Sequence, residues 1–158
     1  MSRIRVEIEI EDRKDVQVIE LDAPDLDSIL KEVRALAAVE GLHVFERDKD
    51  EPLGSEVLTR TALSLHGHRC REVEVRVRYE HRTLEHKFAP ATTVFRVLLW
   101  AVGKRGFNLD DTAKAKANLM LPGAEQPLPK DAVIGSFVKH GDCCLTLDLT
   151  LKDFTNGC

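Results

Sequence analysis

The order of hydrophobic patterns is the same in both halves of this 158-residue chain. Apolar and polar residues alternate over residues 4–10 and again over 73–79, which is the period of a half-buried β-strand. A second strand pattern follows in each half, over residues 16–21 and 83–88, and an Ala-Pro pair ends it. A helix and further strand patterns come next. The sequence therefore predicts two units of similar design.

The two predicted helices begin directly after these Ala-Pro pairs. Apolar residues spaced i, i+3, i+4, i+7 and i+11 predict a first helix within residues 25–41, with Asp25 as its N-cap. The second helix is predicted over residues 94–104, and either Thr92 or Thr93 can cap it. Each helix thus has one apolar stripe available to cover a sheet.

The returning strands complete the predicted fold. In the first half they are expected at residues 42–46 and 58–65, and in the second half at 117–121 and 144–151. The loop before the third strand of the second half carries the paired acids Asp110-Asp111, expected in a solvated turn, and a hydrophobic turn is expected around residues 134–137. A hairpin crossed by a helix, with strands returning beside the first, is the arrangement of a β-grasp domain. The expected fold class is α+β, with two tandem β-grasp domains.

The boundary between the two domains is expected at residues 66–70. This division gives an N-terminal domain of residues 1–69 and a C-terminal domain of residues 70–158, with a flexible tail over 152–158. The first half has 16 acidic and 10 basic residues and a net charge of −6, whereas the second half has 11 acidic and 13 basic residues and a net charge of +2. The acidic half is expected to act as bulk or as a recognition module.

Composition excludes several classes of protein. No apolar run approaches the ~18 residues of a membrane span, and the N-terminus lacks the apolar stretch of a signal peptide, so a cytoplasmic protein is expected. The net charge of −4 argues against binding to nucleic acid. In a reducing compartment the cysteines are expected to be free thiols. Cys143 and Cys144 are adjacent, so one is expected in the core and the other outside.

The second half resembles ubiquitin-like proteins over about residues 72–158. The features that carry this resemblance are a hydrophobic triplet on the third strand, a glycine turn, a leucine, a short turn with an isoleucine, a leucine-rich strand and a tail with glycine near its end. These are Leu119-Met120-Leu121, Gly123, Leu128, Ile134, the series Leu145, Leu147, Leu149 and Leu151, and Gly157. Tandem units with a single such tail are similar to two-domain modifiers of Bil-type antiphage operons.

The resemblance implies a function for the tail. In ubiquitin-like modifiers the terminal glycine is activated and then joined to a lysine by an isopeptide bond, so Gly157 would be the conjugation site after removal of Cys158. Asn156 stands where the family often has a second glycine, and Asn156 and Phe154 would meet the enzymes. The implied partners are an activating enzyme, a conjugating enzyme, a deubiquitinase-like protease and target proteins, in antiphage defence.

Two residues outside the tail are also candidates for partner binding. Strand alternation turns Met120 outward, and the corresponding residue of ubiquitin-like proteins belongs to a recognition patch. The second helix has an additional apolar face, formed by Phe95, Leu99 and Val102 with Trp100 near its edge. This face is expected either to pack against the first half, which is the favoured interpretation, or to bind a partner.

Other functions remain as alternatives. The second hypothesis is a non-covalent ubiquitin-like interaction module, and the third is a sulfur carrier, which the extra domain and the missing Gly-Gly pair disfavour. No catalytic motif occurs, so the protein is expected not to be an enzyme and to need no cofactor. His66, His68 and Cys70 alternate as metal ligands would on a strand, but the absence of an evident fourth ligand favours a polar linker.

Overall fold

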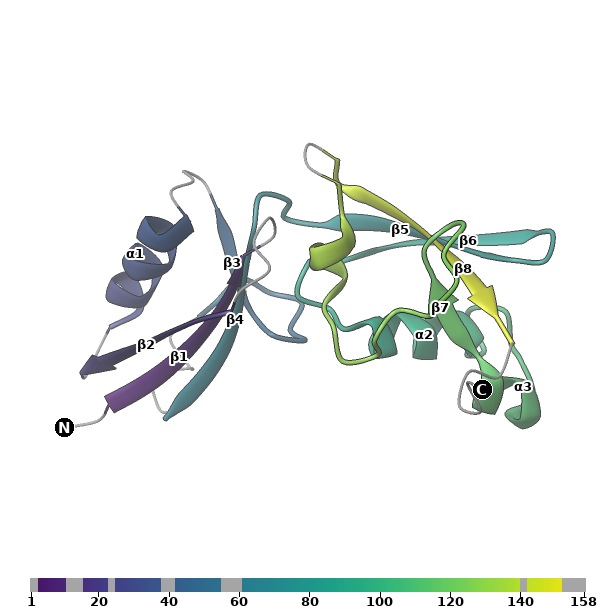
Figure 1. The fold of residues 1–158 in the computed structure, drawn as a ribbon, viewed down its shortest axis with the longest axis horizontal. Helices are drawn as coiled ribbons and strands as arrows, with labels where there is room; N and C mark the ends of the chain where they lie inside the picture. The colour runs from purple at the N-terminus through teal and green to yellow at the C-terminus, as the bar shows by residue number, and fades with distance from the viewer. Residues whose placement is uncertain are drawn as a thin grey trace.

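In a computed structural model of the protein, two four-stranded sheets lie along the long axis of the molecule (Figure 1). In the part of the chain that the structure describes, no helix is both long and apolar enough to cross a membrane. The described residues are 3–10, 16–22, 25–37, 42–54, 61–139 and 142–151.

The first sheet contains four strands and is accompanied by one helix. Strands β1 (Arg3–Ile10) and β2 (Gln17–Asp22) form an antiparallel hairpin, and helix α1 (Leu26–Ala37) follows. Strands β3 (His43–Glu46) and β4 (Ala62–His68) then return, with β4 parallel to β1. The strand order is β2-β1-β4-β3.

Alternation along β1 produces the core of this half, as the sequence predicts. Ile4, Val6 and Ile8 are fully buried and pack with α1 residues, whereas the intervening polar residues lie on the other face. Gly67 on β4 belongs to the inner face, and a Cβ there would lie 2.6 Å from Leu42. The side chain of Leu42 therefore packs directly on the backbone of β4 at this point.

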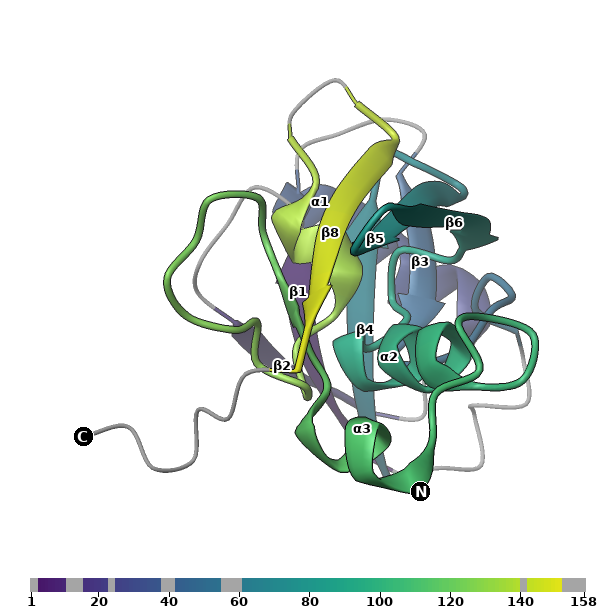
Figure 2. The same ribbon diagram turned by 90° about the vertical axis from the view of Figure 1, so that its right-hand side faces the viewer.

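The second sheet repeats the same topology. Strands β5 (Val73–Tyr79) and β6 (Arg82–Phe88) form the hairpin, helix α2 (Val94–Val102) follows, and β7 (Asn118–Met120) precedes β8 (Cys144–Thr150). Strand β8 is parallel to β5, and the order is β6-β5-β8-β7. Figures 1 and 2 both show α2 on one side of the β5–β6 hairpin. The two mixed sheets fit a β-grasp fold.

Both helices begin at predicted caps. The Asp25 carboxylate accepts a hydrogen bond from Ser28 N–H at 2.8 Å, and Thr93, one of the two candidates in the second half, accepts from Arg96 N–H at 3.3 Å. The predicted apolar stripe of α2 is also confirmed. Its buried members are Val94, Val97, Leu98 and Ala101.

The loop predicted before β7 is only partly a loop. It contains a short helix, α3 (Asp111–Lys116), which begins where the Asp110 carboxylate accepts a hydrogen bond from Ala113 N–H at 2.8 Å. Asp110 is therefore a helix cap, which the prediction of a solvated turn missed. The predicted turn around residues 134–137 is confirmed as a 3-10 helix, η2 (Ile134–Phe137).

Two predictions about cysteines are wrong. Cys70 and Cys143 form a disulfide with their Cα atoms 5.7 Å apart, and only Cys144, which is exposed, is a free thiol among the described cysteines. Cys143 is also exposed, so neither member of the adjacent pair packs in the core. The pairing follows from topology, because Cys70 precedes β5, Cys143 precedes β8, and these strands are parallel neighbours.

The segment predicted as a polar linker is largely strand. β4 continues through His66 and His68, which are opposite Phe45 and His43 of β3, and both β4 imidazoles are buried. Within the ranges described above, no group of three or more His, Cys, Asp or Glu residues is placed to hold a metal ion. The first sheet thus ends at His68 and the second begins at Val73.

Candidate functional site

The C-terminal end of β8 leads into the predicted conjugation tail. The inward row of this strand, Leu145, Leu147 and Leu149, is buried in the second core, so β8 is fixed along its length. The strand ends at Thr150, and Leu151 is the last described residue. The predicted site residues of the tail lie outside the described residues. They are Phe154, Asn156, Gly157 and Cys158.

The outer face of the second sheet is predominantly charged. Met120 is half-buried on β7, opposite Asp148 of β8. Asp148 accepts two hydrogen bonds from Arg78, at 2.6 and 3.0 Å, and these bonds together with the charge of the carboxylate raise the pKa of Arg78. Met120 therefore adjoins a bidentate ion pair, and this face combines a thioether with fixed charges.

Trp100, on helix α2, packs beside the edge of the second sheet opposite to that of Met120. Its indole is 5.5 Å from the rings of both His86 and Phe88, on edge strand β6, whereas Met120 is on the opposite edge strand β7. Trp100 is half-buried by residues of its own half. The structure therefore does not bring the two predicted partner-binding residues into one site.

The favoured interpretation of the additional apolar face of α2 is wrong. Phe95 and Leu99 are exposed by 48% and 52%, so neither is buried against the first half, and Val102 is buried in the core of its own half. The first half instead contacts the N-terminal end of α2 and the segment before it, through Phe45 and Asp48. These contacts leave the row of Phe95 and Leu99 uncovered, and its second interpretation, a partner-binding face, remains open.

An apolar contact connects the outer face of the first sheet to the second half. Phe45 on β3 is fully buried, although its neighbour Val44 occupies the inner face. Phe45 forms a small cluster with Ala89 and Ala91, from the segment between β6 and α2. Two consecutive apolar residues on a short strand were the signal that both faces of β3 are covered.

Asp48 forms the polar part of this junction. Its carboxylate oxygen Oδ1 accepts hydrogen bonds from the N–H and the hydroxyl of Thr93, both at 3.1 Å, at the start of α2. Arg96 donates to the backbone oxygen of Asp48 at 2.8 Å and to the carboxylate of Asp50 at 2.8 Å. Burial lowers the pKa of Arg96, but Asp50 and Asp48 raise it by more, so the pKa lies above its usual value. The first half thus supplies an acceptor to a helix of the second half.

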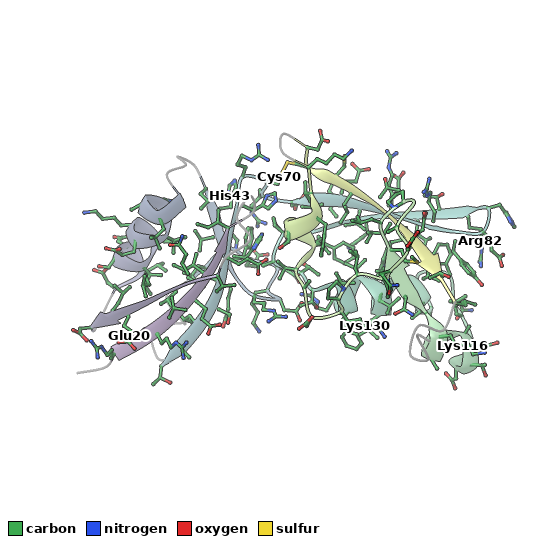
Figure 3. The ribbon with its side chains drawn as sticks, viewed as in Figure 1. Glu20, His43, Cys70, Arg82, Lys116 and Lys130 are labelled. Atoms are coloured by element: carbon green, nitrogen blue, oxygen red, sulfur yellow. A yellow bond between two sulfur atoms is a disulfide. The ribbon has the colours of Figure 1, made fainter. Side chains whose placement is uncertain are left out.

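Two buried histidines complete the junction. His68 Nδ1 accepts the N–H of Cys70 at 2.9 Å, so Nε2 carries the proton and donates to the carbonyl oxygen of Gly135 at 3.2 Å. A Cβ at Gly135 would lie 2.5 Å from His66 Nε2 and 2.9 Å from His68 Cδ2. Figure 3 labels the neighbouring His43 and Cys70 at this junction. Only glycine leaves room for both imidazoles here.

Sequence reasoning missed most of these junction residues. Asp48 has a φ of 66°, a left-handed conformation in which Asp is enriched, but a charged loop gives no sign that its carboxylate will bind the N-cap residue of α2. Gly135 lies in a turn where glycine is ordinary. Ser136 donates a hydrogen bond to Glu9 of β1, a contact between residues far apart in the chain.

Comparison with protein families assigns the second half. Residues 74–152, from the second residue of β5 to beyond the end of β8, match the family model for BilA ubiquitin-like domain 2. A search of curated proteins finds no match. The matched region includes α2, the β8 strand and its first following residues, which agrees with the resemblance inferred from the leucine-rich strand and the glycine turn. Since the match extends over half of the chain, this protein belongs to the BilA ubiquitin-like domain family.

Proposed function

We propose that this protein is a ubiquitin-like modifier, processed after Gly157 and conjugated through that glycine to target proteins in antiphage defence. The observation that carries this proposal is the match of residues 74–152 to a BilA ubiquitin-like domain, which ends where the tail begins. The β8 strand supports it, because its buried leucine row fixes the fold up to Leu149 and leaves the tail sequence after it.

We further propose that the two sheets correspond to two tandem β-grasp domains, residues 1–69 and 70–158. Their strands occupy residues 3–68 and 73–150, and each sheet has its own principal cluster of buried residues. The C-terminal domain would carry the reactive tail. The N-terminal domain would serve as a recognition module attached to it.

The proposed chemistry uses groups supplied by other proteins. A deubiquitinase-like protease hydrolyses the peptide bond between Gly157 and Cys158, which leaves a glycine carboxylate. An activating enzyme joins this carboxylate to the phosphate of ATP with loss of pyrophosphate, and an enzyme thiolate then displaces AMP to form a thioester. A lysine amine of the target displaces the thiol and forms an isopeptide bond. In this scheme the protein is a substrate and its own side chains perform no catalysis.

Glycine suits the terminal position for a steric reason. A tail that lies extended in a narrow enzyme channel requires close approach to its backbone, which a Cβ obstructs. Gly157→Ala is therefore expected to impair conjugation with the fold unchanged, because a substitution outside the described core has little effect on stability. A chain that ends at Gly157 should conjugate without the protease.

Reconstitution with the cognate enzymes tests this proposal. Covalent adducts are read on denaturing gels, and the junction is mapped by mass spectrometry. The chain that ends at Asn156 is the matched control for the chain that ends at Gly157, and it should form no adduct. Adducts of the Asn156-terminated chain, or a junction at any residue other than Gly157, would contradict the mechanism.

One observation favours a second function, the non-covalent interaction module. Phe95 and Leu99 form an exposed apolar pair on α2 that nothing in the described part of the chain covers. Incubation with cell extract separates the two functions by intact mass. Loss of Cys158 supports the modifier, whereas an unchanged chain supports the module and a gain of sulfur at the terminus supports a carrier.

A further inference from the structure

The Cys70–Cys143 disulfide lies at the junction of the two halves. Cys70 is in the segment of residues 69–72, which connects β4 to β5 and which we call the linker, and Cys143 directly precedes β8. Figure 3 shows Cys70 between the two sheets. The bond therefore attaches the linker covalently to a residue of the second half that follows 73 positions later in the chain.

The next residue of the linker is held by the first half. The guanidinium of Arg71 lies 3.3 Å from the carboxylate of Glu51 and 5.5 Å from the centroid of the Phe45 ring. Consecutive residues of the linker are thus attached to different halves, Cys70 to the second and Arg71 to the first. The attachment of Cys70 is covalent, whereas that of Arg71 is an ion pair with a cation–π contact.

The two cysteines of the disulfide differ in their access to solvent. Cys143 is exposed, whereas Cys70 is only 3% exposed. A thiolate from solution attacks a disulfide at the sulfur that it can reach, and the other sulfur becomes the leaving group. Attack on this disulfide is therefore expected at Cys143, with Cys70 released.

The buried sulfur has an acceptor in place for its reduced form. Cys70 Sγ lies 3.3 Å from the carbonyl oxygen of Asp142. In the disulfide this sulfur carries no hydrogen, but as a thiol it would donate to that oxygen. The N–H of Glu74 donates to the carbonyl oxygen of Cys143 at 2.9 Å, a bond between main-chain atoms that does not need the disulfide. Reduction can therefore take place without separation of β5 from β8.

We propose that the Cys70–Cys143 disulfide is a redox-operated latch of the junction, which small-molecule thiols open and their disulfides close while both sheets stay folded. In opening, a thiolate attacks Cys143 Sγ, the S–S bond breaks, and Cys70 leaves as a thiolate that takes a proton from water. A second thiolate attacks the outer sulfur of the mixed disulfide and releases the Cys143 thiolate. Two thiols are oxidised to one small-molecule disulfide and the protein gains two thiols, and closing is the reverse.

Opening changes how the halves are attached to each other. In the reduced state the linker is joined to β8 by non-covalent contacts alone, and the first half is held through contacts such as those of Phe45 with Ala89 and of Asp48 with Thr93. The linker should then unfold locally far more often than either sheet. The proposal does not depend on the tail or on conjugation.

The kinetics of reduction test whether the latch opens in the folded protein. The full chain carries Cys144→Ser and Cys158→Ser, so that Cys70 and Cys143 are its only cysteines. The bridged chain is mixed with glutathione, and free thiols are alkylated and counted by intact mass. The rate of reduction should rise in proportion to the glutathione concentration with unchanged circular dichroism, and glutathione disulfide should restore the bridge. A rate that levels off at the separately measured rate of global unfolding would overturn the proposal, because the bond would then open only in the unfolded chain.

Limited digestion with trypsin tests the effect on the junction. In the reduced full chain, cleavage after Arg69 and Arg71 should be about tenfold faster than in the bridged chain, whereas cleavage after Arg105, in an exposed turn of the second half, should change by less than about twofold. Equal acceleration at all three sites, or none in the linker, would overturn the proposal.

Matched variants separate the bridge from the other thiols. Cys143→Ser should be cleaved in the linker as fast as the reduced chain whether or not glutathione is present, and Cys144→Ser should behave as the original chain does in both states. Circular dichroism shows whether each variant folds, and Cys70→Ser takes the place of Cys143→Ser if the latter does not. Linker cleavage of the folded bridge-free variant at the rate of the bridged chain would contradict the latch.

Discussion

The two halves share a strand order but use their outer sheet faces differently. In the first half this face is covered where Phe45, His66 and His68 meet the second half, and all three are buried. In the second half the outer face is open and carries exposed ion pairs, such as Arg76 with Glu85 at 3.1 Å. The same strand order therefore gives an outer face that packs against the other half in the first sheet and an outer face that is accessible to solvent in the second sheet.

Helices α1 and α2 also differ in the side chains that they expose. Among its described positions, α1 exposes no large apolar side chain and presents residues such as Lys31 and Glu32, whereas α2 exposes Phe95 and Leu99. Helix α1 thus satisfies the ordinary pattern of a surface helix. Helix α2 departs from this pattern, because two of its large apolar side chains are exposed.

Among the changes that test this comparison, removal of the apolar contact at the junction should cause the largest loss of stability. Phe45→Ala deletes a fully buried ring, so a loss of about 3–5 kcal/mol in the free energy of unfolding is expected. Chemical denaturation measures the loss, and hydrogen exchange should show greater exchange around residues 89–92. Val18→Ala, at an exposed position of the same half, is the control and should change stability by less than about 0.5 kcal/mol.

Loss of the disulfide should cause the next largest loss of stability. Cys70→Ser removes a bridge between residues 73 positions apart, and a cost of about 2–4 kcal/mol is expected, because the unfolded chain loses a constraint. Denaturation without reductant measures this cost, and addition of reductant should bring the original protein to the same stability. Cys144→Ser is the control. An equal loss of stability in Cys144→Ser would show that the cost does not come from the disulfide.

Loss of the polar contact should cost less. Asp48→Ala removes the acceptor of the Thr93 N–H and hydroxyl and one partner of Arg96, and about 1–2 kcal/mol is expected. Fraying should appear in the first turn of α2, as measured by amide hydrogen exchange. Asp111→Ala, on α3 of the second half, should leave α2 unaffected. Unchanged protection of α2 in Asp48→Ala would show that the halves do not support one another here.

The smallest loss of stability is expected at Asp25, the N-cap of α1, whose carboxylate accepts its hydrogen bond from Ser28 of the same helix. Hydrogen bonds from the Ser28 side chain and backbone lower the pKa of Asp25 in the folded protein. Its stabilising effect is therefore fully present above the pKa of the unfolded state and is lost as the pH falls through the lowered folded pKa. An NMR titration of the Ser28 amide should follow this loss, and Asp25→Asn should abolish it. A pH-independent Ser28 signal would contradict the assignment.

Local patterns in the sequence predicted the hairpin strands and the two longer helices, because strand alternation and helical stripes depend on neighbours along the chain. Ile4, Val6 and Ile8 show this in the first half, and the buried stripe of α2 shows it in the second. Contacts between segments that are far apart in the chain could not be predicted from such local patterns. The pairing of Cys70 with Cys143 and the packing of Gly135 on two imidazoles depend on how strands align in space.

Asp48 has a consequence for the order in which the chain acquires structure during synthesis. The ribosome releases residues 1–68 first, so the first sheet can form before α2 has emerged. When Thr93 and Arg96 leave the exit tunnel, an acceptor for their hydrogen bonds is already in place. The N-terminal half can therefore present the acceptor for the first turn of α2 while the rest of the second half is still being synthesised.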